Sequence, residues 1–537
     1  MKKFIFLKSI LVFFFMISIM SCTEKKEVLN LPETDLSKEA LIPIPLKIIP
    51  TNSAFALDQF TAIYTSPRIE DLNNVAAFLS EKIKSKTGLR VPVNNTDGAT
   101  VSRIIYINQV DSLDFTNKEA YQLYIKKDSI IVNAKTSEGA FRAIQTLRQL
   151  IPEKSNDTLN SRSIWPIASG KIIDKPNFSY RGAMLDVARH FFSVEDVKKY
   201  IDLLAYYKIN ALHLHLTDDQ GWRIEIKSWP KLTEIGGSTE VGGESGGFFT
   251  QEDYKEIVAY AKKNHMMIIP EVDMPGHTNA ASVSYPILNG NGKTPKLYEG
   301  THVGFSTFDT RKDTVYAFIE DVVREISEIS PSPYFHIGGD ESHVTKKKDY
   351  IYFVERVEKI VNKYGKRMIG WDEVAQAKLE SSSIAQFWNS KENAALAAEK
   401  GMQVLLSPAK KAYLDMQYDP LSKHGLHWAA YIPVDTAYVW TPETYSGIPK
   451  ENILGIEAPL WSETISTVSE LEYLAFPRAI GYSELSWSTV ENRSWEDYKE
   501  RLARQASFLE RMNVNYYPSG LIDWKKNDNS KLLIEKD

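Results

Sequence analysis

Eight apolar segments alternate with helical stretches between residues 180 and 462, and this alternation limits the possible folds more than any other feature. Helical stretches such as SVEDVKKYIDLLAYY and TQEDYKEIVAYAKKN lie between most of the expected strands. The expected strands are 180–188, 210–219, 266–273, 334–341, 367–373, 383–389, 403–408 and 453–462. Strands that alternate with helices form parallel sheets. We therefore expect an α/β protein with a (β/α)₈ TIM barrel.

The segment before the barrel, 41–175, has a mixed pattern. Amphipathic helices are expected at 75–88 and 139–151, with short strands at 103–108 and 121–134. This pattern predicts a small α+β domain with antiparallel hairpins. The sequence of this domain contains no cluster of catalytic side chains.

The first 22 residues have the pattern of an export signal. Lys2, Lys3 and Lys8 precede the apolar run ILVFFFMISIM, which is short for a membrane span. The run ends in IMSC, which resembles a bacterial lipobox and contains Cys22, the single cysteine of the chain. We expect an exported bacterial lipoprotein that carries a lipid anchor on Cys22. Its expected location is the periplasm, the outer membrane or the cell surface. An ordinary signal peptide with a cysteine there by chance is the alternative.

Composition agrees with a globular protein that does not bind nucleic acid. The net charge of −5 lacks the basic footprint of a nucleic-acid-binding protein. The 11 Trp and 27 Tyr residues provide flat apolar faces that suit sugar rings as well as protein cores. The expected segments are a lipoprotein signal peptide at 1–22, a polar tether at 23–40, the α+β domain at 41–175, the barrel at 176–520 and a C-terminal tail at 521–537.

Carboxylates and tryptophans follow nearly every expected barrel strand. They are Asp186 to His190, Asp218 and Asp219, Asp273, Asp340 and Glu341, Trp371 to Glu373, Trp388, and Trp461 to Glu463. Active sites of such barrels lie at the C-terminal ends of the strands. This lining predicts a sugar-binding site.

Asp340 and Glu341 are adjacent in the sequence HIGGDES, at the end of the expected strand 334–341. Most retaining glycosidases hold two carboxyl groups about 5 Å apart, across the scissile bond. Neighbours on a strand point to opposite faces, so this pair fits that geometry poorly. Gly338 and Gly339 would have to bend the backbone for both side chains to enter one pocket.

Six motifs follow one another at the expected strand ends: RGAMLDVARHF, HLHLTDDQGWR, PEVDMPGH, HIGGDE, GWDE and APLWSE. In this order they resemble family 20 glycoside hydrolases, the β-N-acetylhexosaminidases. The resemblance runs from about residue 176 through an expected closing helix at 495–512, and the α+β domain also resembles the family's N-terminal domain. It implies exo-acting release of terminal β-linked N-acetylglucosamine, and also of N-acetylgalactosamine, from glycans.

The resemblance also implies a mechanism that suits adjacent carboxylates. Family 20 enzymes use substrate assistance instead of a protein nucleophile. The substrate's 2-acetamido oxygen attacks the anomeric carbon and forms an oxazolinium-type intermediate, so the β configuration is retained. Glu341 would protonate the leaving oxygen and later activate water, Asp340 would orient the acetamido group and stabilise the intermediate, and Tyr413 would donate a hydrogen bond to the acetamido oxygen.

Further roles follow from the same resemblance. His277 is expected to couple an aspartate of the TDD sequence to Glu341, with Asp218 favoured over Asp219. The guanidinium of Arg189 offers a fixed fork of donors for sugar hydroxyls. The expected substrate-binding residues are Arg189, Asp415 and Glu463 for the hydroxyls, Trp371, Trp388 and Trp461 as aromatic walls, and Trp428 for the next sugar.

A metal-dependent hydrolase and a non-catalytic glycan-binding lipoprotein are the two alternative functions. His213 and His215 form an H-x-H pair, and a metal site could be built from this pair with Asp218, Asp219, His277 and Asp340. The pair lies before the end of its strand, where packing inside the barrel is the simpler explanation, so neither a metal nor a cofactor is expected. A glycan-binding lipoprotein would keep the tryptophans and lose the acid, whereas this chain keeps the complete set.

Overall fold

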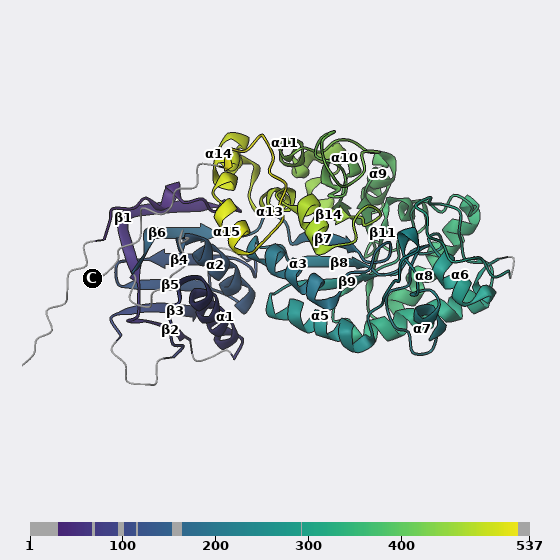
Figure 1. The fold of residues 1–537 in the computed structure, drawn as a ribbon, viewed down its shortest axis with the longest axis horizontal. Helices are drawn as coiled ribbons and strands as arrows, with labels where there is room; N and C mark the ends of the chain where they lie inside the picture. Colours follow the sequence, from purple (N-terminus) through teal and green to yellow (C-terminus); the bar gives the residue numbers. More distant parts are fainter. Residues whose placement is uncertain are drawn as a thin grey trace, which may run out of the picture.

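The computed structural model describes residues 31–66, 70–94, 101–113, 116–152, 164–290 and 293–524. They form a small sheet domain and a barrel that lie side by side along the longest axis of the molecule (Figure 1). The predicted signal peptide with Cys22 lies outside the described residues. Within the described part of the chain, no helix has the length and apolar character needed to cross a bilayer.

The N-terminal domain is a mixed sheet with two helices. Its elements are β1 (Lys47–Leu57), β2 (Thr61–Thr65), α1 (Glu70–Thr87), β3 (Arg103–Gln109), β4 (Tyr121–Ile125), β5 (Ser129–Ala134), α2 (Ser137–Leu150) and β6 (Trp165–Asp174). The strand order is β1-β6-β4-β5-β3-β2. The expected antiparallel hairpin exists between β4 and β5, but β2, β3 and β5 pair in parallel. The helix α1 makes the crossover that the parallel pair β2 and β3 requires.

Residues 31–40 of the segment expected to be a polar tether lie within the described part of the chain, where they pack on the fold. A short 3₁₀ helix, η1 (Leu36–Lys38), is capped by the side chain of Asp35. Leu36 is fully buried in the core that β-strands and helices of the N-terminal domain share. Hydrogen bonds from Arg504 to Lys38 O and from Gln505 to Ala40 O also hold this segment against the fold, which the polar composition of 23–40 does not indicate.

Eight parallel strands of the described residues close the barrel in the order β10-β11-β12-β13-β14-β7-β8-β9. The strands are β7 (Tyr180–Asp186), β8 (Ala211–His215), β9 (Met267–Glu271), β10 (Tyr334–His336), β11 (Arg367–Trp371), β12 (Ile384–Phe387), β13 (Gln403–Leu406) and β14 (Ile453–Leu460). Every residue of β7 and β14 is buried, as expected for strands covered on both faces. The predicted TIM barrel is confirmed.

Helices surround the barrel (Figure 1). They are α3 (Val194–Tyr206), α4 (Lys231–Glu234), α5 (Gln251–Lys263), α6 (Asn279–Ser284), α7 (Asp313–Ile329), α8 (Lys347–Lys363), α9 (Lys391–Glu399), α10 (Ala409–Ala412), α11 (Val434–Tyr438), α12 (Val468–Ala475), α13 (Arg478–Trp487), α14 (Trp495–Ala503) and α15 (Ala506–Arg511). Capping boxes start α3 at Ser193 and α5 at Thr250, which explains why SVEDV and TQEDY begin helices.

Two predicted elements differ in the structure. The expected closing helix 495–512 is broken into α14 and α15. The expected strand 334–341 ends at His336, so Asp340 and Glu341 lie in the loop that follows β10. The strand is shorter because Gly338 and Gly339 take positive φ angles, which end the extended conformation.

Buried ion pairs connect the N-terminal domain to the starts of the barrel strands. The carboxylate of Glu119 lies 2.8 Å from Arg142 Nε and 3.0 Å from Nη1 of Arg181, a residue of β7. Nearby, Lys208 Nζ lies 3.0 Å from Oδ2 of Asp174, at the end of β6. The two domains therefore share one charged, water-excluded interface at the N-terminal end of the barrel.

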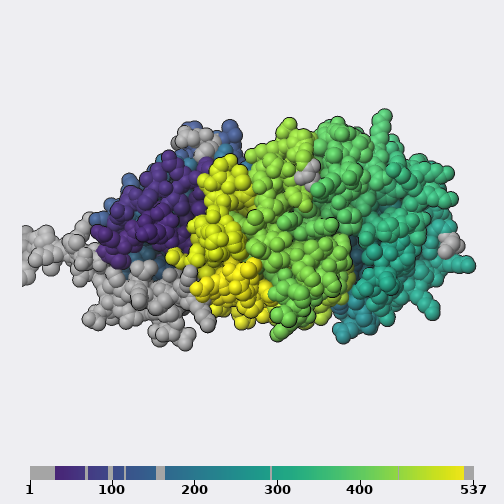
Figure 2. Space-filling model, turned by 90° about the horizontal axis from the view of Figure 1, so that it is seen from above, coloured from purple at the N-terminus to yellow at the C-terminus, as the bar shows by residue number. Residues whose placement is uncertain are grey.

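The segment before β1 contacts the last helices. Ile44 N–H donates to Glu484 Oε2 at 2.8 Å, and Arg501 Nη1 donates to the carbonyl of Leu41 at 2.7 Å. In the space-filling view, the yellow C-terminal helices lie between the purple N-terminal strands and the green part of the barrel (Figure 2). Both ends of the folded chain thus meet at the domain boundary.

Candidate active site

A cavity of about 220 Å³ opens where the barrel strands end. Nine of the twelve predicted catalytic and substrate-binding residues line it: Arg189, Asp340, Glu341, Trp388, Tyr413, Asp415, Trp428, Trp461 and Glu463. His277 and Asp218 lie directly behind the wall, and Trp371 lies deeper. The structure therefore brings most of the predicted residues into one place.

A left-handed backbone lets two neighbouring carboxylates face the same cavity. Gly338, Gly339 and Glu341 have φ angles of 65°, 100° and 44°. A Cβ atom on Gly338 would lie 1.8 Å from Asp273 Oδ1, so only glycine fits there. The same Asp273 oxygen accepts a hydrogen bond from Gly339 N–H at 3.0 Å and holds the turn. Because the pair is not on a strand, the alternation of side-chain direction does not apply to Asp340 and Glu341.

His277 faces both carboxylates. Its Nε2 atom lies 3.8 Å from Glu341 Oε2 and 3.9 Å from Asp340 Oδ2. Its other ring nitrogen, Nδ1, lies 3.0 Å from Asp218 Oδ1. Asp219 instead accepts hydrogen bonds from Asn279 N–H and from a serine hydroxyl. The partner of His277 in the TDD sequence is therefore Asp218, the residue that the sequence favoured.

Arg189 is held rigidly at the cavity wall. Its guanidinium pairs with Asp186 Oδ2 at 3.1 Å and with Asp218 Oδ2 at 2.8 Å, and it lies 4.9 Å from the ring centre of Trp461. These partners fix the direction of the donors that remain for a ligand. Arg189 and Glu463 line the cavity together, so a cation and a carboxylate stand close enough to share one group of sugar hydroxyls.

Three buried carboxylates at this end of the barrel, Asp340, Asp273 and Asp415, have raised pKa values. Burial, and then the neighbouring Asp273, raise the pKa of Asp340 well above its ordinary value. Burial also raises the pKa of Asp273 to about 7 and, together with Glu463, that of Asp415. Asp340 Oδ1 and Asp415 Oδ1 have no hydrogen-bond partner among the described residues. This wall therefore favours ligands that bring hydrogen-bond donors or positive charge.

Aromatic side chains form the remaining wall. Tyr413 is almost fully buried and packs edge-on against Trp428 and at a tilt against Trp461, with ring centres 6.0 and 6.2 Å away. The indole of Trp388 donates to Glu373 Oε2 at 3.1 Å. Trp428 is 57% exposed, so it lies at the rim. A deep aromatic floor with an exposed tryptophan at the entrance suits one enclosed sugar and one sugar outside.

Trp371 differs from its predicted place. It is fully buried and does not line the cavity. Its Nε1 donates to Glu271 Oε1 at 3.0 Å, and its ring packs 5.7 Å from the ring of Trp461. Trp371 therefore supports an aromatic wall residue from behind, because its hydrogen bond turns the indole toward the barrel interior.

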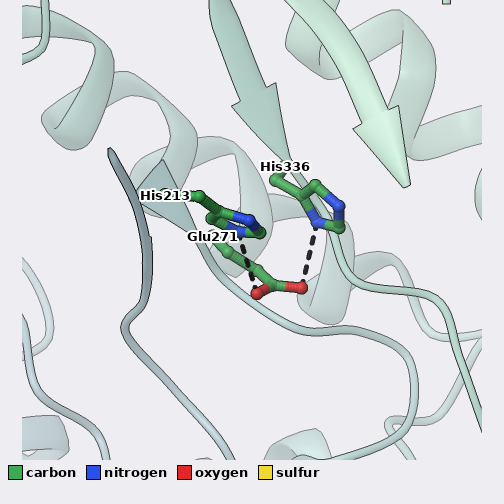
Figure 3. Close-up of side chains that lie close together, drawn as sticks. All are labelled: His213, Glu271 and His336. Atoms are coloured by element: carbon green, nitrogen blue, oxygen red, sulfur yellow. Dashed lines mark ion pairs between the residues drawn. The ribbon is translucent and has the colours of Figure 1, made fainter. Parts of the chain in front are cut away.

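The histidines that suggested a metal site form part of a charge network inside the barrel. His213 lies 2.9 Å from Glu457 Oε1 and 3.0 Å from Glu271 Oε2, and His336 lies 3.0 Å from Glu271 Oε1 (Figure 3). The spacing of His213, Glu271 and His336 would also suit metal ligands. His213 Nδ1 is hydrogen-bonded to Glu457 Oε1 at 2.9 Å. His336 Nδ1 accepts a hydrogen bond from Gly338 N–H at 3.0 Å, so each ring already has a partner within the protein.

The sequence did not predict three of the residues that line the cavity: Thr301, Val303 and Leu426. Thr301 and Val303 belong to the long connection between α6 and α7, and Leu426 belongs to the insertion before β14. None of them carries a titratable group or stands at a strand end. The sequence therefore gave no signal for them beyond the length of these two connections.

Comparisons with known proteins match both domains. A model of the family described as "Glycosyl hydrolase family 20, catalytic domain" matches residues 178–490, and a model of the family's domain 2 matches residues 38–174. The chain is 35% identical to a beta-N-acetylhexosaminidase of Cellulomonas fimi, over 90% of this chain and 97% of the relative. Matches therefore extend over nearly all of the described fold.

Solved structures agree. The GH20 beta-N-acetylhexosaminidase from Streptomyces coelicolor A3(2) superposes with a TM-score of 0.86 at 42% identity, covering 90% of this chain and 99% of that one. A GH20 exo beta-N-acetylglucosaminidase from Vibrio harveyi, solved in complex with N-acetylglucosamine, gives a TM-score of 0.79 at 33% identity, covering 89% and 78%. With a catalytic-domain match over more than half of its length, the chain belongs to glycosyl hydrolase family 20.

Proposed function

We propose that this protein is an exo-acting, retaining β-N-acetylhexosaminidase that releases terminal β-linked N-acetylglucosamine from the non-reducing ends of glycans. The observation that carries the proposal is the placement of Asp340 and Glu341, adjacent in sequence, in one cavity with Tyr413. Such a pair is poorly placed to act as acid and nucleophile across one bond, and the substrate-assisted mechanism of family 20 takes the nucleophile from the substrate instead.

Glu341 acts on the leaving oxygen of the substrate, whereas Asp340 and Tyr413 act on its acetamido group. Glu341 donates a proton to the leaving oxygen while the acetamido oxygen attacks the anomeric carbon. Asp340 accepts a hydrogen bond from the acetamido N–H and stabilises the positive charge that develops on it. Tyr413 donates to the acetamido oxygen and directs it at the anomeric carbon. Glu341 then takes a proton from the water that opens the oxazolinium-type intermediate, which returns the sugar with its β configuration.

The test measures turnover of chromogenic β-N-acetylglucosaminide and of the matching β-glucoside, which lacks the acetamido group. Hydrolysis of the first and not of the second supports substrate assistance. A thiazoline analogue of the intermediate is expected to inhibit competitively. Equal turnover of both glycosides, or failure of the thiazoline to inhibit, would contradict the mechanism.

We further propose that N-acetylgalactosamine is accepted at the same site. The two sugars differ at the 4-hydroxyl, which faces the group formed by Arg189, Asp415 and Glu463. Because this group offers both donors and acceptors, it has partners for either orientation of the hydroxyl. Measuring kcat/KM for the two chromogenic glycosides decides the point, and undetectable cleavage of the galactosaminide would reject the proposal.

A lipid anchor is our third proposal, and it is supported by the sequence around Cys22 alone. The expected product is an exported protein attached to a membrane through a lipidated cysteine. Metabolic labelling with a radioactive fatty acid should mark the wild-type protein and not the Cys22→Ser variant. Equal labelling of the two, or no labelling of the wild type, would support an ordinary signal peptide instead.

A further inference from the structure

One carboxylate at the centre of the barrel contacts four aromatic or imidazole rings. Glu271 is the last residue of β9 and is fully buried. Its Oε2 atom lies 2.5 Å from His215 Nδ1 and 3.0 Å from His213 Nε2. Its Oε1 atom accepts a hydrogen bond from Trp371 Nε1 and lies 3.0 Å from His336 Nδ1. In the close-up, the rings of His213 and His336 both approach the carboxylate of Glu271 (Figure 3).

A continuous chain of ionisable groups leads from this carboxylate to the cavity. The second nitrogen of His215, Nε2, lies 2.8 Å from Asp218 Oδ2. The other oxygen of Asp218 lies 3.0 Å from His277 Nδ1, and His277 Nε2 lies 3.8 Å from Glu341 Oε2. Both nitrogens of His215 face carboxylate oxygens, and this arrangement favours the imidazolium form of the ring. His215 thus links two negative groups with one positive charge.

We propose that Glu271 is a positioning residue for the catalytic acid Glu341 and acts on it through His215, Asp218 and His277. Glu271 keeps His215 positively charged. That charge acts together with Arg189, which pairs with the same oxygen of Asp218 at 2.8 Å, to hold Asp218 ionised and in place behind His277. Glu271 itself lines no part of the cavity. The inference deepens the proposed hydrolase function and rests on it.

The electrostatic setting agrees with this role. Burial alone would lower the pKa of His215, but Glu271 raises it well above its ordinary value. Burial alone would raise the pKa of Glu271, but His215, His336 and His213 hold it well below the usual range. The charged and titratable groups that face Glu271 and His215 from the surrounding elements are His213 on β8, His336 on β10, Asp186 on β7, Asp218 after β8, Asp273 after β9 and Asp340 after β10.

Glu457 on β14 provides a matched control within the same barrel. It is also fully buried, and it pairs with His213 Nδ1 at 2.9 Å and with Gln386 Nε2 at 2.7 Å. Glu457 forms no hydrogen bond or ion pair with His215. Its connection to the chain that leads to Glu341 runs through His213 and Glu271. Its replacement removes the same charge at the same depth without touching the link to Asp218.

The experiment compares the pH dependence of kcat/KM for Glu271→Gln, Glu457→Gln and the wild type. Without the Glu271 charge, the buried His215 becomes neutral, and Asp218 Oδ2 keeps only one of its two positive partners, Arg189. Groups around His277 then hold their protons to higher pH. We expect both limbs of the Glu271→Gln profile to move upward by at least about half a pH unit, and the Glu457→Gln profile to stay within half that shift.

An unchanged Glu271→Gln profile, or equal shifts in both variants, would overturn the inference. If Glu271→Gln does not fold, nitrogen NMR of the histidine rings of the wild-type protein decides. His215, assigned by its loss in a His215→Gln variant, is expected as an imidazolium from pH 5 to 8, and a neutral ring would reject the chain. An inactive wild type would instead count against the proposed function, so the two failures are distinguishable.

Discussion

The two ends of the barrel both bury carboxylates, but they surround them with opposite balances of charge. At the end that meets the N-terminal domain, Glu119 lies between Arg142 and Arg181. Burial alone would raise the pKa of Glu119, yet the two arginines lower it to about 2. At the cavity end, burial and neighbouring carboxylates raise the pKa of Asp340 well above its ordinary value. Glu119 is neutralised by its neighbours, whereas Asp340 is left able to bind a positive charge.

The charged residues at the N-terminal end of the barrel therefore contribute to stability, whereas those at the cavity end serve catalysis. A carboxylate that is paired with arginines is already stabilised in the folded protein. A carboxylate without such a partner is stabilised only when a ligand binds next to it. The oxazolinium-type intermediate brings such a positive charge. Mutations at the two ends are therefore expected to affect different measurements, which allows the comparison to be tested.

The largest effect is expected at Glu341. Glu341→Gln removes the proton donor, so activity on substrates with a poor leaving group should fall by about 10²–10⁴-fold. A substrate whose leaving group needs no protonation should retain much of its first-step rate. Steady-state and burst kinetics with a series of aryl glycosides measure this difference, and a loss that is equal for all leaving groups would contradict the role of acid.

Asp340→Asn should reduce turnover by about 10²–10³-fold. The amide cannot stabilise the positive intermediate, and this defect does not depend on the leaving group. The measurement is kcat for the same aryl series, with Glu341→Gln as the matched neighbour. Wild-type rates in Asp340→Asn would show that substrate assistance does not operate here.

At the opposite end, Glu119→Gln should lower the free energy of unfolding by about 3–5 kcal/mol, because it leaves two buried arginines without their partner. Activity per folded molecule should be unchanged. The wild-type pair contributes its stability above the unfolded-state pKa of glutamate, and this contribution is lost as the pH falls toward 2. Denaturant titrations between pH 3 and 7 follow the effect, and a variant as stable as the wild type at pH 7 would contradict it.

Gly338→Ala tests the backbone that directs the adjacent carboxylates. The new Cβ would collide with Asp273, so we expect at least about 1–3 kcal/mol of lost stability, together with reduced kcat. Gly365→Ala is the control, since its φ angle is 72° and no atom stands within 4 Å of the new Cβ. Thermal unfolding and kcat should show a loss of activity only for Gly338→Ala, and equal activities would argue against a role for this turn.

The smallest effect is expected from metal removal. Dialysis against EDTA should leave the activity unchanged, because carboxylates, a tyrosine and the substrate carry every step of the proposed mechanism. The assay is turnover before and after dialysis, with added Zn²⁺ or Mg²⁺ as the control. Activity that is lost and then restored by a metal would identify the buried histidine and carboxylate groups as ligands.

The sequence predicted the barrel because periodic strands and capping boxes are local signals. It also located most of the cavity residues, since strand ends meet at one edge of a barrel. It did not predict the depth of Trp371, which depends on a hydrogen bond to Glu271 on a different strand. Asp218 and Asp219 could be separated only by the loop that turns one toward His277 and the other toward Asn279.

The contact between Ile44 and Glu484 joins residues that are 440 positions apart. During synthesis the N-terminal sheet can pair early, because its strands all lie before Asp174. The segment at Leu41 and Ile44 must wait until the last helices have been made, and such distant contacts form late in folding. Closure of the domain boundary therefore requires that translation has passed Arg501, and a nascent chain stopped before Arg501 would lack this contact.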